Sequence, residues 1–215
     1  MKAVIFDLDG TLVDSAPDIH AAGNAALAGF GAAPVDLPTA RGFVGGGARI
    51  FVQRMMRATG TDPAREDDVL AAFVAHNEGA VTLTRAYPGV IAALDALLAR
   101  GHRLGMCTNK PEGAIGAVLD AFDLRDRFDA AVGGDTTPAV KPDPASLRET
   151  MARMGVSECI YVGDSEVDAE TAKRAQCPFV LHLPGYRHAD PEILAPDAQF
   201  DDYTALPGIV AKLSG

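Results

Sequence analysis

Short apolar runs alternate with amphipathic stretches along most of the chain. The apolar runs predict five strands, at residues 3–6, 103–110, 128–135, 159–165 and 178–183. The amphipathic stretches between them predict helices, at residues 89–101, 111–124, 143–155 and 166–176. Strands and helices in this alternating order are typical of an α/β fold with a parallel sheet covered on both faces.

One block interrupts this alternation after the first strand. Residues 15 to about 80 contain helical stretches at 15–31 and 63–80, a loop and helix interrupted by Gly45, Gly46 and Gly47 at 39–60, and no strand pattern. We therefore predict a core domain formed by residues 1–14 and 82–215, and an inserted all-helical cap domain at 15–81. The cap would lie over the strand ends, with hinges after Leu12 and at Tyr87–Pro88.

Composition and charge exclude several classes of protein. The formal net charge is −10, so the basic footprint of a nucleic-acid-binding protein is missing. No apolar stretch is long enough to span a bilayer, which argues against a membrane protein. Three cysteines with no CxxC pair, and an N-terminus that runs directly into a strand, predict reduced thiols in a cytoplasmic protein.

Polar side chains follow four of the predicted strands, where an open α/β sheet binds its ligands. They are Asp7 and Asp9 after the first strand, Thr108 and Asn109 after the second, Lys141 after the third, and Asp164 with Asp168 after the fourth. An acidic chain that binds an anionic substrate needs local positive charge. Carboxylate oxygens are ligands that Mg²⁺ prefers, so Asp7 and Asp164 predict such a site.

The same residues suit phosphoryl transfer. Asp7 would act as the nucleophile, and Asp9 as general acid and then as base. Gly10 would let the backbone approach a phosphate, Thr108 would donate a hydrogen bond, and Lys141 would stabilise negative charge. Asn109 is also predicted to contact the phosphate. Each feature also has a structural explanation, such as a turn, a solvated lysine or a helix cap. Four together, in this order and spacing, favour one shared site.

Four motifs resemble the haloacid dehalogenase superfamily: "DLDGT" (7–11), "CTNK" (107–110), "KPDP" (141–144) and "GDSEVD" (163–168). The resemblance implies a Rossmann-like sheet of strand order 5-4-1-2-3 with a C1-type cap. It implies that Asp7 is nucleophile and metal ligand, and that Asp9 is acid/base and binds metal through its carbonyl. Asp164 would be a metal ligand, and Asp168 would support the metal or its waters. The carboxylate of Asp9 favours a phosphatase or phosphomutase over a dehalogenase.

Further stretches resemble the phosphoglycolate phosphatase branch, among them "LVDSAPDI" (12–19), "RGFVGGGARI" (41–50) and a late "GY" (185–186). The resemblance implies 2-phosphoglycolate as substrate, in a monomer or homodimer acting on a small phosphorylated metabolite. Residues 43–49, including Gly46, would then dip over the substrate, with Arg41 and Arg49 on its carboxylate. The alternatives are a glycine hinge and two surface arginines.

Other functions remain open at this point. A pyrophosphatase, a sugar-phosphate phosphatase and a phosphomutase use the same scaffold, and a non-catalytic binding protein is the alternative from another class. Residues 15–80 contain no lysine, which disfavours a phosphonate hydrolase with a Schiff base in the cap. The five scattered histidines are expected to be structural, and the Cys107 side chain should face away from the site. The acidic stretch 197–206 is expected to be a surface turn that leads into a final helix.

Overall fold

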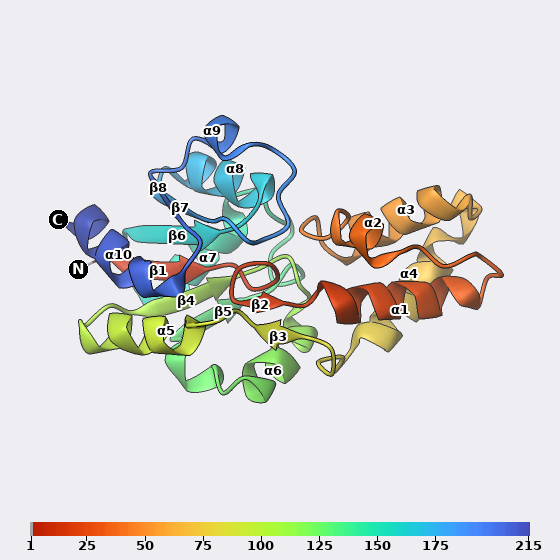
Figure 1. Cartoon of the computed structure of the whole chain (residues 1–215), viewed down its shortest axis with the longest axis horizontal. Coiled ribbons are helices and arrows are strands. Elements are labelled where there is room, and N and C mark those ends of the chain that lie inside the picture. The colour runs from red at the N-terminus through yellow and green to blue at the C-terminus, as the bar shows by residue number, and fades with distance from the viewer. Residues whose placement is uncertain (1) are drawn as a thin grey trace.

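The central sheet of the computed structural model, which describes residues 2–215, has six parallel strands (Figure 1). Their order is β5-β4-β1-β6-β7-β8. In chain order the strands are β1 (Ala3–Phe6), β4 (Leu104–Cys107), β5 (Ala130–Val132), β6 (Cys159–Gly163), β7 (Phe179–His182) and β8 (Ala198–Phe200). The five predicted strands have the expected order, and β8 is added at one edge.

The edge strand β8 corrects the prediction of a surface turn at residues 197–206. The strand is followed by a 3₁₀ turn, η3 (Tyr203–Ala205), in which Tyr203 is buried. The Tyr203 hydroxyl donates to the carbonyl of Thr11, 2.5 Å away. A three-residue strand is too short to show a clear period, so only its pairing with β7 identifies it.

Side chains of β1 alternate between two hydrophobic clusters, as the pleat of a strand requires. Val4 and Phe6 pack beneath α5 (Val90–Ala99), α6 (Glu112–Ala121) and α10 (Leu206–Ser214). Ala3 and Ile5 face α7 (Ala145–Met154) and α8 (Glu166–Ala175) on the opposite side. The short elements η2 (Arg125–Arg127) and α9 (Pro191–Leu194) lie in connections at the periphery. The parallel sheet is therefore covered on both faces, as predicted.

Helix ends lie within three residues of the sequence-based bounds, except in the stretch 39–60, which is divided into α2 (Leu37–Arg41) and α3 (Ala48–Thr59). The first helix ends at Ala28 rather than Gly31. Helix α7 begins at Ala145, with Pro144 as its N-cap residue. The Asp143 carboxylate accepts a hydrogen bond from the Ala145 N–H. Gly155 ends α7 in the left-handed conformation, as predicted.

The inserted segment packs around a hydrophobic cluster of its own. It contains α1 (Ala16–Ala28), α2 (Leu37–Arg41), α3 (Ala48–Thr59), η1 (Pro63–Arg65) and α4 (Glu66–Asn77). Helices α1, α3 and α4 meet at Phe51, Met55 and Phe73, and lie beyond the strand ends, opposite the two termini (Figure 1). Because this cluster is separate from those of the sheet, we propose that residues 15–81 form the cap and that 1–14 with 82–215 form the core.

A small antiparallel ribbon joins the cap to the core. β2 (Val13–Asp14) pairs with β3 (Arg85–Ala86), so the two connections lie side by side where hinges were expected. Strands of two residues carry no periodic signal, and the sequence did not predict them. No helix among residues 2–215 is long and apolar enough to cross a membrane.

Candidate active site

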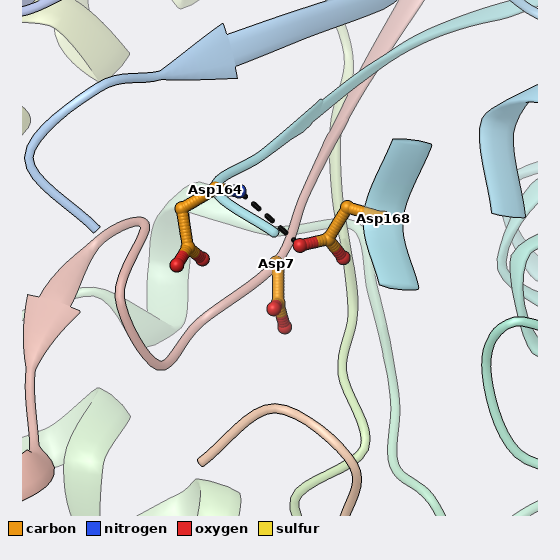
Figure 2. A group of neighbouring side chains, drawn as sticks. All are labelled: Asp7, Asp164 and Asp168. Atoms are coloured by element: carbon orange, nitrogen blue, oxygen red, sulfur yellow. Dashed lines mark hydrogen bonds between the residues drawn. The ribbon is translucent and has the colours of Figure 1, made fainter. Parts of the chain in front are cut away.

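Three buried carboxylates meet at the carboxyl ends of the two central strands. Asp7 follows β1, Asp164 follows β6, and Asp168 lies in the first turn of α8 (Figure 2). The three are brought together because β1 and β6 are parallel neighbours. One oxygen of each carboxylate lies within 4.8 Å of the others. All three side chains are almost completely excluded from solvent.

Lys141 is the cation of this cluster. Its ammonium lies 2.7 Å from Asp168 Oδ1 and 3.1 Å from Asp7 Oδ1, and it donates to the Tyr161 hydroxyl at 2.8 Å. Lys141 is itself buried, so these contacts are screened little by water. Tyr161 was not predicted as part of the site, because it lies inside an apolar strand that resembles any other core strand.

One ammonium does not balance three buried carboxylates. Burial raises the pKa of Asp7 to about 7, although Lys141 opposes the change. Burial also raises the pKa of Asp164 well above its ordinary value. Burial acts in the same direction on Asp168, but Lys141 and hydrogen bonds hold the pKa of that carboxyl below its ordinary value. The excess of negative charge is the electrostatic condition that a divalent cation would relieve.

The hydrogen bonds distinguish Asp7 from the other two carboxylates. Asp164 Oδ1 accepts from Thr11 Oγ1 at 2.9 Å, and its Oδ2 accepts from the Tyr186 N–H at 2.6 Å. Asp168 Oδ1 accepts from Lys141 and Tyr161, and its Oδ2 accepts from Ser165 Oγ at 2.6 Å and from two backbone N–H groups. Asp7 Oδ1 accepts from the Leu8 N–H, and no hydrogen bond to Oδ2 is found among residues 2–215. The donor set suits a hard cation such as Mg²⁺, with Asp7 and Asp164 as candidate ligands and Asp168 as their support.

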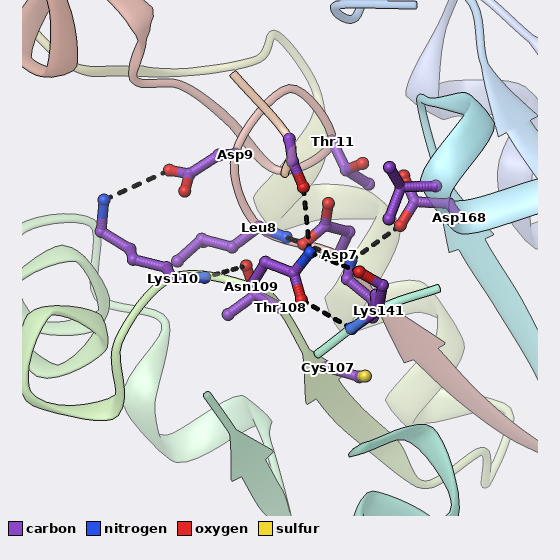
Figure 3. Close-up of polar contacts among 12 residues, drawn as sticks. Asp7, Leu8, Asp9, Thr11, Cys107, Thr108, Asn109, Lys110, Lys141 and Asp168 are labelled. Atoms are coloured by element: carbon purple, nitrogen blue, oxygen red, sulfur yellow. Dashed lines mark hydrogen bonds and ion pairs between the residues drawn. The ribbon is translucent and has the colours of Figure 1, made fainter. Parts of the chain in front are cut away.

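Asp9 lies on the other side of Asp7 and outside the acidic cluster. Its Oδ1 accepts from Ser15 Oγ at 2.5 Å and lies 3.4 Å from Lys110 Nζ (Figure 3). Figure 3 shows Lys110 reaching Asp9 while Lys141 lies beside Asp7 and Asp168. Lys110 was not assigned a role from the sequence, although it follows Thr108 and Asn109 directly and could have been considered with them.

Gly10 lies beside Asp164, where a side chain would not fit. Its φ is +87°, and a Cβ there would lie 2.4 Å from Asp164 Oδ2. The Gly10 N–H donates to the carbonyl of Val13, so it is not available to a phosphate. The Gly10 carbonyl accepts from Nδ1 of His182, whose pKa burial lowers to about 4. A neutral histidine therefore supports the loop, in agreement with its expected structural role.

The two polar residues after β4 have different environments. Thr108 is buried, and its hydroxyl oxygen accepts from the Lys110 N–H at 3.3 Å, which leaves the hydroxyl proton free to donate. The Asn109 amide donates to the carbonyls of Gly45 and Lys141 and accepts from the Lys141 N–H. The predicted phosphate contact of Asn109 is therefore not available from its side chain, which instead ties the cap loop to the core.

Cys107 points away from these groups, as predicted. Its side chain packs in the cluster that contains α7 and α8, and burial raises the pKa of the thiol to about 11. A neutral, buried thiol of this kind is a poor nucleophile.

A cavity of about 40 Å³ separates the strand ends from the cap. The core wall of the cavity contains Asp7, Asp9, Thr108, Asn109, Lys110 and Pro111. The cap wall contains Ile19, Val44, Gly45, Gly47, Ala48, Phe51, Phe73 and Asn77. Four of the predicted site residues, Asp7, Asp9, Thr108 and Asn109, therefore meet the cap across one small space, while Lys141, Asp164 and Asp168 lie outside its lining.

The cap residues predicted to contact substrate do not line this cavity. Arg41 forms an ion pair with Asp14 at 2.7 Å. Arg49 is 54% exposed and forms ion pairs with Glu66 and Asp67. Gly46 lies between two glycines of the cap wall but does not line the cavity itself. In this structure both guanidinium groups are bound to carboxylates of the chain, so the predicted contact with a substrate carboxylate is not supported.

Residues 1–176 match the family model of haloacid dehalogenase-like hydrolases. A phosphoglycolate phosphatase of Cereibacter sphaeroides is 48% identical over 99% of both chains. A phosphoglycolate phosphatase of Rhodobacter capsulatus is 41% identical over 97% of this chain and 96% of its own. The crystal structure of a predicted phosphoglycolate phosphatase from Haemophilus somnus is 30% identical, covers 98% of both chains and superposes with a TM-score of 0.91. The chain therefore belongs to the haloacid dehalogenase-like hydrolases.

Proposed function

We propose that this haloacid dehalogenase-like hydrolase is a Mg²⁺-dependent phosphatase that hydrolyses 2-phosphoglycolate through a phosphorylated Asp7. The observation that carries the proposal is the buried set of three carboxylates around one lysine at the strand ends. Asp7 and Asp164 would hold the metal, and bound Mg²⁺ would supply positive charge to the carboxylates and the phosphoryl oxygens. The names of the relatives favour 2-phosphoglycolate as the substrate.

Asp7 is arranged to attack phosphorus with one of its two oxygens. The Leu8 N–H and Lys141 hold Oδ1, and Oδ2 is the oxygen that would form the new bond to phosphorus. The ester P–O bond breaks as that bond forms, and its electrons pass to the leaving oxygen. Thr108 would donate its hydroxyl proton in a hydrogen bond to a phosphoryl oxygen.

Asp9 would act as the general acid in the first step and as the general base in the second. In the first step its carboxyl group gives a proton to the leaving oxygen. In the second step its carboxylate takes a proton from the water that attacks phosphorus, and the bond from phosphorus to Asp7 breaks to release phosphate. Ser15 and Lys110 hold Asp9 Oδ1 at the edge of the cavity.

The cavity favours a compact monoester over the alternative substrates. Its cap wall includes the bulky side chains of Ile19, Phe51 and Phe73, which favour a small substrate over one that carries a sugar ring. Pyrophosphate would bring a second phosphate. Among residues 2–215, Lys110 is the one cationic side chain that lines the cavity, and Lys141 lies outside the lining, paired with Asp7. A second phosphate would therefore find little positive charge.

Phosphate release from a panel of esters tests the proposal. We expect 2-phosphoglycolate to have a higher kcat/KM than pyrophosphate and glucose 6-phosphate, and turnover to need Mg²⁺. Asp7→Asn should lower kcat by at least about 10⁴-fold, because it removes the nucleophile. Asp126→Asn, which changes an exposed aspartate, is the matched control and should keep full activity.

Two outcomes of that panel would contradict different parts of the proposal. A higher kcat/KM for another ester would contradict 2-phosphoglycolate as the substrate, but would be compatible with the proposed mechanism. Equal rates for the wild-type protein and Asp7→Asn would overturn the chemistry, and would bring forward the alternative of a binding protein.

A further inference from the structure

Asn77 is a buried amide whose oxygen has no hydrogen-bond partner in the part of the chain that the structure describes. It is the last residue of α4, its exposed fraction is 8%, and its Oδ1 is unpaired. A buried polar atom without a partner costs about 1–3 kcal/mol, so most such atoms in folded proteins are bonded. Because Asn77 lines the cavity that Asp7 also lines, a ligand in that cavity is the natural partner.

The N-terminus of α3 meets the same cavity. Gly47, its N-cap residue, and Ala48, its first residue, both line the cavity with Asn77. The first N–H groups of a helix have no partner within the helix and attract anions. Gly47 has no side chain to cap them, and its φ of +87° disfavours the residues that usually do. Helix α3 has 12 residues and no acidic residue in its first turn.

No charged side chain from the cap lines the cavity. The cap wall is apolar apart from Asn77 and the backbone of the glycine loop. The two arginines nearest in sequence to this loop, Arg41 and Arg49, are paired with carboxylates of the chain. An anionic group at the far end of a substrate would therefore meet the Asn77 amide and the N–H groups of α3.

We infer that Asn77 and the N-terminus of α3 form a subsite for the carboxylate of a phosphorylated hydroxy acid. The inference rests on the proposed function, which places the phosphoryl group at Asp7. No hydrogen bond to Asn77 Oδ1 is found among residues 2–215, so a half-turn of the amide group leaves no bond of that oxygen broken and can present its N–H to a carboxylate oxygen. The Asn77 amide and the N–H groups of α3 are neutral donors, which suit the single charge of a carboxylate. The second phosphate of pyrophosphate would carry more negative charge than these donors can balance.

A pair of substrates that differ only in the carboxylate tests this subsite. Ethyl phosphate has nearly the shape of 2-phosphoglycolate but ends in a methyl group. We expect Asn77→Asp to lower kcat/KM for 2-phosphoglycolate by about 100-fold, because a hydrogen bond to a charged group becomes a repulsion between like charges. For ethyl phosphate the change should be less than about 3-fold, since that substrate has no group to bind there.

Two further variants complete the test. Asn77→Ala adds no charge, and should lower kcat/KM for 2-phosphoglycolate alone by about 10-fold. Ala75→Asp adds a negative charge to the exposed face of α4, and should change neither substrate by more than about 3-fold. The turnover of ethyl phosphate shows whether each variant is folded.

The outcomes separate this inference from the proposed function. A wild-type protein that does not prefer 2-phosphoglycolate to ethyl phosphate contradicts the proposed substrate, and the subsite with it. A wild-type preference that survives in both Asn77 variants contradicts the subsite alone. Equal losses for both substrates would show that Asn77 only supports the cap, and would also overturn the inference.

Discussion

The two walls of the cavity differ in polarity and charge. The core wall presents the carboxylates of Asp7 and Asp9 together with Lys110, and Lys141 lies directly behind it. The cap wall presents apolar side chains, a glycine loop and one amide. Bond breaking needs charges that are held in place before the substrate arrives, whereas selection among small esters needs shape and a few directed donors. Under the proposed function, the core would perform the chemistry and the cap would select the substrate.

Replacing Lys141 is expected to have the largest effect on stability. Lys141→Met leaves the acidic cluster without its cation, and should lower the free energy of unfolding by about 3–5 kcal/mol in the absence of divalent metal. Urea unfolding in EDTA and in Mg²⁺ measures this, and we expect Mg²⁺ to stabilise the variant more than the wild-type protein. Lys173→Met, which changes an exposed lysine, should shift the value by less than about 0.5 kcal/mol. A loss below about 1 kcal/mol for Lys141→Met would contradict the electrostatic argument.

Acid should destabilise the protein through His182. Its pKa is lowered from 6.5 to about 4 in the folded chain, so between these values the unfolded chain binds a proton that the folded chain does not. Stability is therefore unaffected by His182 above pH 6.5, and falls as the pH drops, by up to about 3 kcal/mol. We expect this acid loss, measured by urea unfolding at pH 7 and pH 4.5, to be smaller by about 2 kcal/mol in His182→Gln.

The control for this pH dependence is His76→Gln in the cap. His76 is exposed on α4, so its replacement should leave the acid loss of the wild-type protein unchanged. An equal acid loss in the wild-type protein and His182→Gln would show that His182 is not the source.

The smallest effect is expected at Arg49. Its ion pairs with Glu66 and Asp67 are exposed, so Arg49→Ala should change the free energy of unfolding by less than about 1 kcal/mol. Its kcat/KM for 2-phosphoglycolate should stay within about 3-fold of the wild-type value, because the side chain does not line the cavity. Steady-state kinetics of Arg49→Ala and Asn77→Ala with 2-phosphoglycolate would show which of the two cap side chains affects kcat/KM. A loss above about 10-fold would mean that Arg49 reaches the substrate in another cap position.

Much of the core wall, and of the carboxylate cluster beside it, could be predicted because these residues follow strands with clear periodicity. Asp7, Thr108 and Asp164 come directly after apolar runs, and parallel strands bring their carboxyl ends to one edge. The cap wall could not be predicted in the same way. A helical pattern indicates which face is apolar but does not say which residue faces the core, so it gave no signal for Asn77. Arg49 was named from the resemblance alone.

The sequence by itself determined the α/β fold, the inserted helices and the acidic and basic residues at the strand ends, and the resemblance of its motifs to a known family implied the central strand order. These features depend on local periodicity and on motifs of a few residues. Only the tertiary structure decided that His182 supports the carbonyl of Gly10, 172 positions earlier in the chain, and that Tyr161 joins Lys141 and Asp168. It also decided that Asn77 faces the cavity. Such contacts join segments that are far apart along the chain, and their geometry exists only when the sheet and the cap are packed together.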